Sequence, residues 1–418
     1  MGNITAQTLK GFRDFLPRES GKRQYVQNLL KQVFESFGFE PLETPALEYE
    51  EILLGKYGDE GDKLMYRFTD QGGRRVALRY DQTVPLARVV AQYQNQLPIP
   101  FKRYQIQPVW RAENPQRGRF REFLQCDIDT VGLNSPLSDA EVIACTIKSL
   151  ETLGFKNFKA IINDRTIFSD LVNNAIFKDY NLFSIIRIVD KLNKIGYEEV
   201  IDELTEKITS GDESSATSIL CTLEDSKPTQ NLKDIFKALE EELGISKEKY
   251  EFSPTLARGL DYYTGLIFEV EIEGYTAGSV GGGGRYDNLI GLFSKQTVPA
   301  VGFAFGFDRL IEVMDQLGLF PADLTTSQVL VTIFSKDLEQ KSAEVASCLR
   351  SNNINTELWL DPQSKLDKQL KYANQKGIPF VVIIGPNEVQ ENKVTLKDLK
   401  NKSQQTISLD EAIQKLTL

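Results

Sequence analysis

The clearest pattern of hydrophobic and polar positions lies between Phe101 and Gly132, where two extended runs flank a polar turn at residues 114–118. In the second run the even positions are mostly apolar, whereas the odd positions hold the ionic groups Arg119, Arg121, Asp127 and Asp129. Successive side chains of a strand point to opposite faces, so the pattern predicts an antiparallel hairpin with one charged face. The pattern alone favours a half-solvated hairpin, with this charged face exposed to water. The density of arginine and the deeper carboxylates instead favour an anion above the hairpin and a cation at its end.

Other segments show either helical or strand periodicity. Apolar spacing predicts helices over residues 21–37, 85–94 and 137–153. Alternation over residues 76–83 predicts a strand with Arg79, Asp81 and Thr83 on one face. Pro41 and Pro45 make residues 39–53 an extended, interrupted segment.

The second half of the chain changes character twice. Residues 164–250 are rich in Lys, Glu, Asp and Leu with helical spacing, which predicts a helical insertion. Strands are predicted at residues 266–272 and 300–306, with Gly281–Gly284 between them and a helix at 307–317. After a polar linker at 321–327, strands and helices alternate through 328–418, as in a small α/β domain. Residues 1–163 and 251–320 therefore form the two parts of one larger domain.

Composition limits the class of protein. The 418 residues are 41% hydrophobic and 26% charged, and no apolar run approaches the roughly 20 residues of a membrane helix. The first residues lack the pattern of a signal peptide. Four widely spaced cysteines without a CxxC motif are expected to be reduced, buried thiols of a cytoplasmic protein. A net charge of −10 argues against indiscriminate nucleic-acid binding, although the basic cluster around the hairpin can steer a polyanion.

The chain contains no histidine, and this removes whole classes of chemistry. Imidazole metal ligands and Ser/His or Cys/His catalytic pairs are excluded. We therefore expect the chemistry to rest on electrostatics and positioning. No side chain has an unperturbed pKa of about 6.5, so the usual source of a near-neutral limb in a pH–rate profile is absent, and a strongly shifted carboxylate or thiol is the alternative source.

Five motifs in order resemble those of one family. RAENPQRGRFREF and AVGFAFGFDRL resemble motifs 2 and 3 of class II aminoacyl-tRNA synthetases, and FEPLETPALE lies where their proline-bearing dimer motif belongs. ARGLDYYTGLIFEV and GGGGRYDNL resemble the two signatures of histidyl-tRNA synthetases. The resemblance runs from Lys10 to the C-terminus. It implies an α+β fold: an antiparallel six-stranded catalytic sheet flanked by helices, a helical insertion domain and a C-terminal α/β anticodon-binding domain, in a homodimer.

The resemblance assigns residues to ATP. Arg111 and Arg309 match the arginines of motifs 2 and 3 that hold the α-phosphate, and guanidinium groups fork onto phosphate oxygens at any working pH. Glu113 matches the position that accepts from the adenine amino group, and Arg121 matches an ATP-contacting position. Arg117 and Arg119 on the turn are assigned to tRNA, with ATP as the alternative for Arg119.

The resemblance also assigns residues to histidine. Asp81, Thr83 and Gln125 match positions that hold its α-amino and carboxylate groups. Asp129 and Tyr263 match positions that read the two nitrogens of the ring, one a donor and one an acceptor. Tyr262 lies beside them, and packing is its favoured role. Arg258 matches the arginine that bridges the substrate carboxylate and the α-phosphate, with a strand-edge ion pair as the alternative.

The implied activity is the formation of histidyl-adenylate from histidine and ATP, with Mg²⁺, followed by transfer to tRNA(His); no metal ligand is assigned to the protein. Without an enzyme histidine, the substrate ring is expected to set the acid limb of pyrophosphate exchange. Ala112 and Leu124 depart from the residues common at these positions, and Asp129 is one methylene shorter than the glutamate of some relatives. The rival interpretation is a catalytically inert paralogue that senses histidine as a regulatory subunit of ATP phosphoribosyltransferase. A generic RNA-binding relative is the second alternative.

Overall fold

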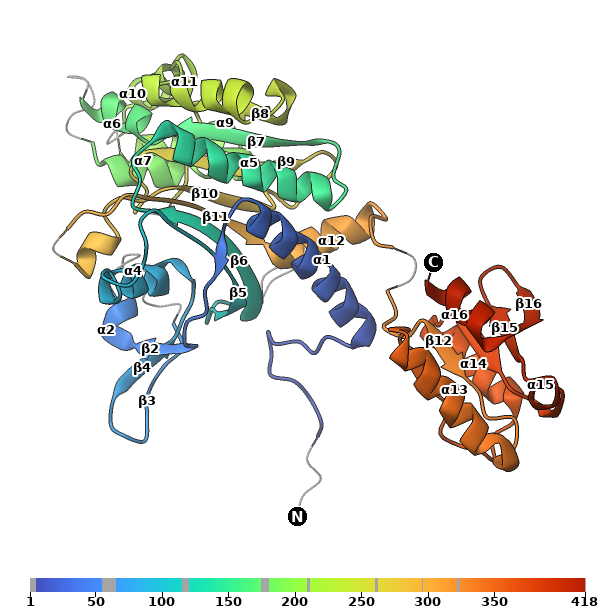
Figure 1. Ribbon diagram of the computed structural model, residues 1–418. Coiled ribbons are helices and arrows are strands. Elements are labelled where there is room, and N and C mark those ends of the chain that lie inside the picture. Colours follow the sequence, from blue (N-terminus) through green and yellow to red (C-terminus); the bar gives the residue numbers. More distant parts are fainter. Residues whose placement is uncertain are drawn as a thin grey trace. The chain divides into compact units, whose positions relative to one another are not determined.

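The computed structural model describes residues 5–54, 65–114, 120–173, 180–208, 211–259, 262–294, 296–321 and 324–417 (Figure 1). The chain divides into two compact units, one built around Val26–Leu319 and the other around Phe320–Leu418, with Phe15–Tyr25 grouped with the second. Each unit is described by itself below.

The first unit is organised around an eight-stranded sheet of order β1-β5-β6-β11-β10-β9-β7-β8. In that order the strands are β1 (Glu40–Pro41), β5 (Phe101–Trp110), β6 (Glu122–Val131), β11 (Ala300–Gly306), β10 (Gly281–Arg285), β9 (Leu266–Ile272), β7 (Phe158–Asp164) and β8 (Tyr250–Phe252). The six central strands are antiparallel, and only β1 and β8 at the edges pair in parallel. The expected antiparallel six-stranded sheet is confirmed.

One face of this sheet carries the aromatic core. Phe268 of β9, Phe303 and Phe305 of β11 and Phe34 of helix α1 (Pro17–Ser36) form a continuous stack with ring centroids 4.8–6.0 Å apart. Helices α5 (Pro136–Thr152) and α12 (Phe307–Gln316) pack against β6 and β11 (Figure 1). Side chains alternate between the two faces along a strand. Gly302 and Ala304, which neighbour Phe303 and Phe305, therefore lie on the opposite face.

A smaller sheet of order β2-β4-β3 precedes the hairpin, with strands β2 (Leu47–Tyr49), β4 (Arg75–Leu78) and β3 (Arg67–Thr69). Helix α2 (Glu50–Leu53) follows β2, and helix α4 (Thr83–Gln92) follows β4. The predicted strand over residues 76–83 is therefore wrong beyond Leu78. The Asp81 carboxylate accepts the Val84 N–H at 3.3 Å, and Pro85 sits in the first turn, where no N–H is needed, so the chain enters a helix.

The helical insertion follows β7. It comprises α6 (Thr166–Asn173), α7 (Leu182–Val189), α8 (Leu192–Ile195), α9 (Tyr197–Lys207), α10 (Glu213–Glu224), α11 (Gln230–Lys237), the π-turn η1 (Ala238–Glu242) and the 3₁₀ turn η2 (Lys247–Lys249) (Figure 1). Its first helices enclose a core of their own, with Ile185, Val200 and Leu220 fully or almost fully buried. A further 3₁₀ turn, η3 (Ile290–Leu292), precedes β11.

The second unit is a five-stranded sheet of order β13-β12-β14-β15-β16. Its strands are β12 (Val329–Val331), β13 (Thr356–Leu358), β14 (Phe380–Ile383), β15 (Val394–Asp398) and β16 (Ser403–Ile407). Its helices are η4 (Lys336–Leu338), α13 (Glu339–Ser351), α14 (Leu366–Lys376), α15 (Pro386–Gln390) and α16 (Leu409–Thr417). The sequence predicted one final strand, whereas β15 and β16 form a hairpin. Strand β16 was missed because it is almost wholly exposed and polar.

The expectation that the four cysteines are reduced and buried is confirmed only in part. All four cysteines are free, and Cys126 and Cys145 are buried, but Cys221 is exposed and Cys348 is half-buried. Among the described residues, no helix combines the length and the apolar character needed to cross a bilayer.

Candidate active site

The face of the large sheet opposite the aromatic core is almost bare of side chains at its centre. Directly paired residues share a face, and on this face β11 presents Gly302, Ala304 and Gly306 while β10 presents Gly282 and Gly284. We call these five residues the glycine floor. The run Gly281–Gly284, which the sequence left unassigned between two predicted strands, thus lies within strand β10 and does not form a flexible turn.

Side chains from neighbouring segments lie directly on the glycine floor. A Cβ atom at Gly282 would come within 1.8 Å of Arg258 Nη1, and one at Gly302 within 1.9 Å of Asp129 Oδ1. A Cβ at Gly284 would come within 2.9 Å of the Tyr263 ring. Glycine is therefore required here for close approach. The approaching groups are the protein's own predicted site residues.

The strand register places these residues at two successive levels of the floor. At the first level, Asp129 pairs with Gly302, and Gly302 pairs with Gly284, over which Tyr263 lies. At the second level, Asp127 pairs with Ala304, and Ala304 pairs with Gly282, over which Arg258 lies. Two carboxylates thus line one side of the floor, and a phenol and a guanidinium line the other.

Arg258 is held in an ion pair. Its Nη1 donates to Glu269 Oε1 of β9, and its guanidinium carbon lies 5.8 Å from the centroid of the Tyr263 ring. Burial lowers the pKa of Arg258, but Tyr263 and Glu269 outweigh that effect and keep the pKa above its ordinary value. The sequence analysis gave an ion pair as the alternative role of Arg258. This ion pair is present, and it fixes the guanidinium over Gly282. Tyr262 packs against Tyr263, with ring centroids 4.6 Å apart, as its favoured role required.

Asp81, Thr83 and Gln125 gather at the end of the floor beside β6. Asp81 is 5% exposed, Thr83 begins α4, and Gln125 pairs with Gly306. Burial raises the pKa of Asp81 to about 7, although the Val84 N–H and the charges of Arg111 and Arg103 oppose that rise. The structure therefore supplies a carboxyl group that titrates near neutrality in a chain without histidine.

The arginines assigned to ATP lie at the open end of the hairpin and at the start of α12. Arg111 donates through Nε to the Tyr80 carbonyl at 3.1 Å, and its guanidinium carbon lies 5.0 Å from the Phe123 ring centroid. Arg121 donates through Nε to the Glu113 carbonyl at 3.0 Å, which brings those two residues together. Arg309 donates to the Ser279 carbonyl at 2.6 Å, next to the floor residue Gly306. Arg117 and Arg119 lie outside the described residues.

Sequence reasoning missed three members of the site: Arg103, Asp127 and Tyr286. Arg103 is fully buried, with Nη2 2.7 Å from Asp129 Oδ2 and 3.9 Å from Asp127 Oδ2. The Tyr286 hydroxyl donates to Asp129 Oδ1. The odd parity of Asp127 on β6 and the place of Tyr286 in GGGGRYDNL were usable signals. The pairing of Arg103 with Asp129 across β5 and β6 becomes apparent only from the register.

Burial dominates the electrostatics of this cluster. It raises the pKa of Asp127, and the neighbouring Asp129 carboxylate raises it further against the opposing charge of Arg103. Burial also raises the pKa of Asp129, but Arg103 and the Tyr286 hydroxyl oppose that rise, so Asp129 is the more acidic of the two. Gln125, Asp127 and Asp129 on the charged face of the hairpin are therefore buried, and the solvated interpretation is wrong for this part of the face.

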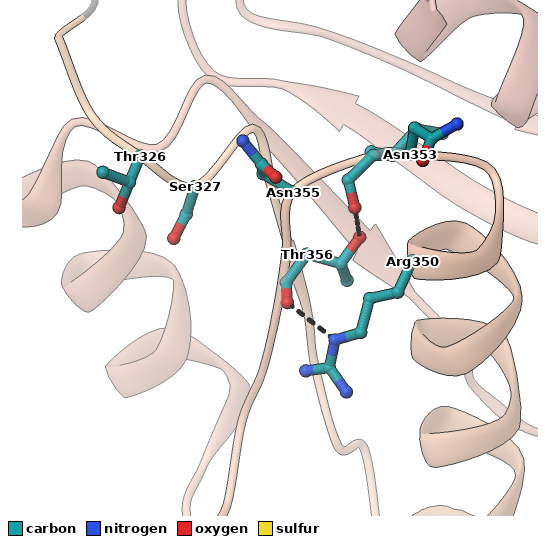
Figure 2. A pocket seen from close by; sticks show the side chains of 7 residues that line it. Thr326, Ser327, Arg350, Asn353, Asn355 and Thr356 are labelled. Carbon is teal, nitrogen blue, oxygen red and sulfur yellow. Dashed lines mark hydrogen bonds between the residues drawn. The ribbon is translucent and has the colours of Figure 1, made fainter. Parts of the chain in front are cut away.

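A separate pocket of about 590 Å³ lies in the second unit, between the C-terminal end of α13 and the starts of β12 and β13. Figure 2 shows Arg350 and the polar side chains of Thr326, Ser327, Asn353 and Asn355 around it. Arg350 donates through Nε to the Thr356 carbonyl at 3.0 Å. The lining has one cation, several amide and hydroxyl groups and no carboxylate, which suits an anionic group.

Comparisons with known proteins cover nearly the whole chain. Residues 11–310 match the family model described as histidyl-tRNA synthetase, and residues 328–417 match the anticodon-binding domain model. A histidine–tRNA ligase of Cytophaga hutchinsonii is 40% identical over 97% of this chain and 98% of its own length.

Solved structures give the same result. The crystal structure of histidyl-tRNA synthetase from Nostoc sp. PCC 7120 is 31% identical and covers 99% of this chain and 100% of its own, with a TM-score of 0.85. A protein from Bacillus halodurans, described as an ATP phosphoribosyltransferase regulatory subunit/histidyl-tRNA synthetase, covers 89% of this chain and 97% of its own, with 24% identity and a TM-score of 0.71. At that identity the second likeness supports the fold alone.

Proposed function

The chain belongs to the histidyl-tRNA synthetase family. From this premise we propose its reaction and the role of each site residue in it. It is a histidine–tRNA ligase: it joins histidine and ATP into histidyl-adenylate with release of pyrophosphate, and then transfers the histidyl group to the 3′ end of tRNA(His). The regulatory-subunit alternative has less support, because the curated relative at 40% identity is named as a ligase.

We place the substrate histidine on the glycine floor. The observation that carries this placement is the register, which puts Asp129 and Tyr263 on opposite sides of one level and Arg258 at the next. Neutral imidazole offers one N–H and one acceptor nitrogen, which Asp129 and the Tyr263 hydroxyl complement. The substrate carboxylate then lies at Arg258, and Asp81, Thr83 and Gln125 are close to its amino-acid end.

The activation step needs charge stabilisation and orientation. A carboxylate oxygen of histidine attacks the α-phosphorus in line, and the bond to the β-phosphate oxygen breaks, so pyrophosphate leaves with the electron pair. We assign Arg258 to bridging the carboxylate and the α-phosphate, and Arg111 and Arg309 to the charge that spreads over the phosphate oxygens. Glu113 and Arg121 hold the nucleotide. No step requires a protein base, which fits a chain without histidine.

Mg²⁺ enters in this proposal with the phosphates of ATP, because it usually keeps several waters and uses one or two protein carboxylates. Among the residues that the structure describes, no three Cys, Asp or Glu side chains gather into a metal site, so ATP and water would supply most of its ligands. When bound, the ion supplies charge neutralisation to the phosphates.

We propose the domain roles as follows. Residues 1–163 and 251–320 form the catalytic domain, 164–250 the insertion domain, 321–327 the linker and 328–418 the anticodon-binding domain. The family-model matches at 11–310 and 328–417 support this division. We also propose a cytoplasmic location, which cell fractionation would test.

We further propose a homodimer. The outer face of the small sheet carries Leu47, Tyr49 and Phe68, which are 43%, 51% and 43% exposed. Contiguous exposed apolar side chains of this kind mark interaction surfaces.

Histidine-dependent ATP–pyrophosphate exchange tests the proposed function. The wild-type protein should exchange and should charge tRNA(His). Arg258→Lys should lower the rate of exchange far more than it lowers the affinity for histidine. Lysine keeps the charge but cannot present two parallel donors to carboxylate and phosphate. Histidine binding without any exchange in well-folded wild-type protein would favour the regulatory alternative.

A further inference from the structure

Asp127 lines the β6 side of the glycine floor, yet neither the motifs nor the proposed function gives it a role. It is 2% exposed and lies on β6 between Gln125 and Asp129, facing Ala304 of β11. Its Oδ2 accepts from Gln125 Nε2 at 2.8 Å. Its Oδ1 is buried and has no hydrogen-bond partner among the residues that the structure describes.

A buried carboxyl oxygen without a hydrogen-bond partner is costly, so its persistence requires a reason. Arg103 does not provide the missing partner, because its Nη2 lies 2.7 Å from Asp129 but 3.9 Å from the nearer oxygen of Asp127, Oδ2. Gln105, the β5 partner of Asp127, donates instead to Thr44 and Gln107. The hydrogen-bonding capacity of Oδ1 is therefore unused by the described residues, and a donor on a bound substrate would satisfy it.

The placement of histidine identifies that group. With the ring between Asp129 and Tyr263 and the carboxylate at Arg258, the α-carbon lies over the floor between the two levels. Asp127 stands on the β6 side of this position and Arg258 on the β10 side. An α-ammonium group carries three N–H donors, as a lysine ammonium does.

We propose that Asp127 is a histidine-binding residue whose Oδ1 accepts an N–H of the substrate's α-ammonium group. The proposal rests on the proposed function. It adds Asp127 to Asp81, Thr83 and Gln125 as a residue that recognises the amino-acid end of histidine, while Asp129 recognises the ring.

The charges around Asp127 give the proposal a second signature. Gln125 and Asp129 flank it on β6, Arg103 faces it from β5 and Asp81 from the segment before α4, and Arg258 and Glu269 lie across the floor. Burial and the Asp129 carboxylate favour the protonated form of Asp127 in the free protein. An arriving ammonium favours the charged form. Histidine binding should therefore release a proton from Asp127.

Calorimetric titration with three ligands tests the assignment. Histidine and histidinol carry the amino group, whereas 3-(imidazol-4-yl)propanoate lacks it. Asp127→Asn should weaken histidine and histidinol about tenfold or more, equal to about 1.4 kcal/mol, and leave the propanoate within about twofold of wild type. Asp129→Asn, the matched control two residues along β6, should weaken all three. Melting curves of both variants confirm that they fold.

Proton release gives the independent readout. Titrations at pH 7 in buffers of different ionisation enthalpy should show more protons released on histidine binding by wild type than by Asp127→Asn. Equal release, or equal weakening of all three ligands by Asp127→Asn, would overturn the proposal and leave Asp127 as a support for Asp129. Unchanged affinity for all three would also overturn it. A wild-type protein that bound none of the ligands would instead overturn the proposed function.

Discussion

Gly282 is the residue on which the position of Arg258 depends. A methyl group there would lie 1.8 Å from Arg258 Nη1 and 2.5 Å from Cζ. Because the colliding atoms are the far end of a flexible side chain, Gly282→Ala should fold, with the guanidinium displaced. Displacements of about 1 Å in a catalytic group cost roughly 100-fold in rate. We therefore expect pyrophosphate exchange to fall about that far, with little change in melting temperature.

Gly291→Ala is the matched control for this substitution. A Cβ at Gly291 would meet the Gln296 carbonyl at 3.4 Å, an ordinary van der Waals contact. Its exchange rate should stay near that of wild type. A Gly282→Ala enzyme with full activity would show that the close approach of Arg258 is not needed for activation.

Asp81 should make the free energy of unfolding depend on pH. Its folded pKa of about 7 lies above the ordinary value of 3.8. Between these values the folded state holds a proton that the unfolded state has released, so stability falls as pH rises from about 4 to about 7. The loss is at most about 4 kcal/mol. Urea unfolding at pH 5 and pH 8 should show a smaller difference for Asp81→Asn than for wild type, and identical differences would argue against a raised pKa.

The same group changes the expected pH–rate profile. The absence of histidine predicted that the substrate ring sets the acid limb, with a strongly shifted carboxylate or thiol as the alternative contributor. Burial raises the pKa of Asp81 to about 7 and that of Asp127 to about 8, which favours the carboxylate alternative. We therefore expect the acid limb of histidine activation to have two sources, an enzyme carboxyl and the imidazole of the substrate.

At the scale of elements, strand β10 is fixed at its end by a buried ion pair. Arg285 is 4% exposed and reaches Asp139 at the start of α5 through Nη2 at 2.5 Å and Nε at 3.1 Å. Its Nη1 donates to the Leu133 carbonyl at 3.1 Å. These bonds tie the glycine-rich strand to the helix that packs on the other face of the sheet.

Arg285→Met should therefore destabilise the fold by about 3–5 kcal/mol, because it leaves Asp139 buried and unpaired. The double variant with Asp139→Asn should recover part of the loss. Lys159→Met, which breaks an exposed pair with Glu251 between β7 and β8, should cost less than about 1 kcal/mol. Urea unfolding measures all three, and similar losses from the buried and exposed pairs would contradict this account.

Elements with a strong internal pattern could be predicted from the sequence, and elements set by pairing could not. Strands β9 and β11 were predicted at their observed bounds because β9 alternates apolar and acidic residues and β11 is a continuous apolar run. Glycine carries no hydrophobic signal, so Gly281–Gly284 could equally have formed a turn. The roles assigned to Arg258 and Asp129 came from resemblance, and the partners Glu269 and Arg103 lie on other strands, where no spacing in the sequence points to them.

At the scale of the whole catalytic sheet, the alternation of side chains along strand β11 shapes both the core and the site. Phe303 and Phe305 of β11 pack the core, and the residues that alternate with them, Gly302 and Ala304, leave the other face free for the site. Core packing and site geometry are therefore coupled through a single strand. Enlarging a floor residue disturbs the site first, whereas truncating a phenylalanine disturbs the fold first.

The oligomeric state depends on the outer face of the small sheet. Tyr49 and Phe68 both lie opposite Val76, so they share this face with Leu47. Burying such side chains at an interface is favourable by roughly 25 cal/mol per Å² of apolar area. An introduced carboxylate would have to be desolvated there without a partner, which costs more than the contact gains.

We therefore expect the wild-type chain of 47.3 kDa to sediment as a dimer and the Tyr49→Asp/Phe68→Asp variant to sediment as a monomer. Leu360→Asp is the control, because Leu360 is an exposed leucine of the second unit and lies outside the proposed interface. Its mass should match that of wild type. Analytical ultracentrifugation over a range of concentrations distinguishes the outcomes. A double variant that stayed dimeric with an unchanged dissociation constant would place the interface on another surface.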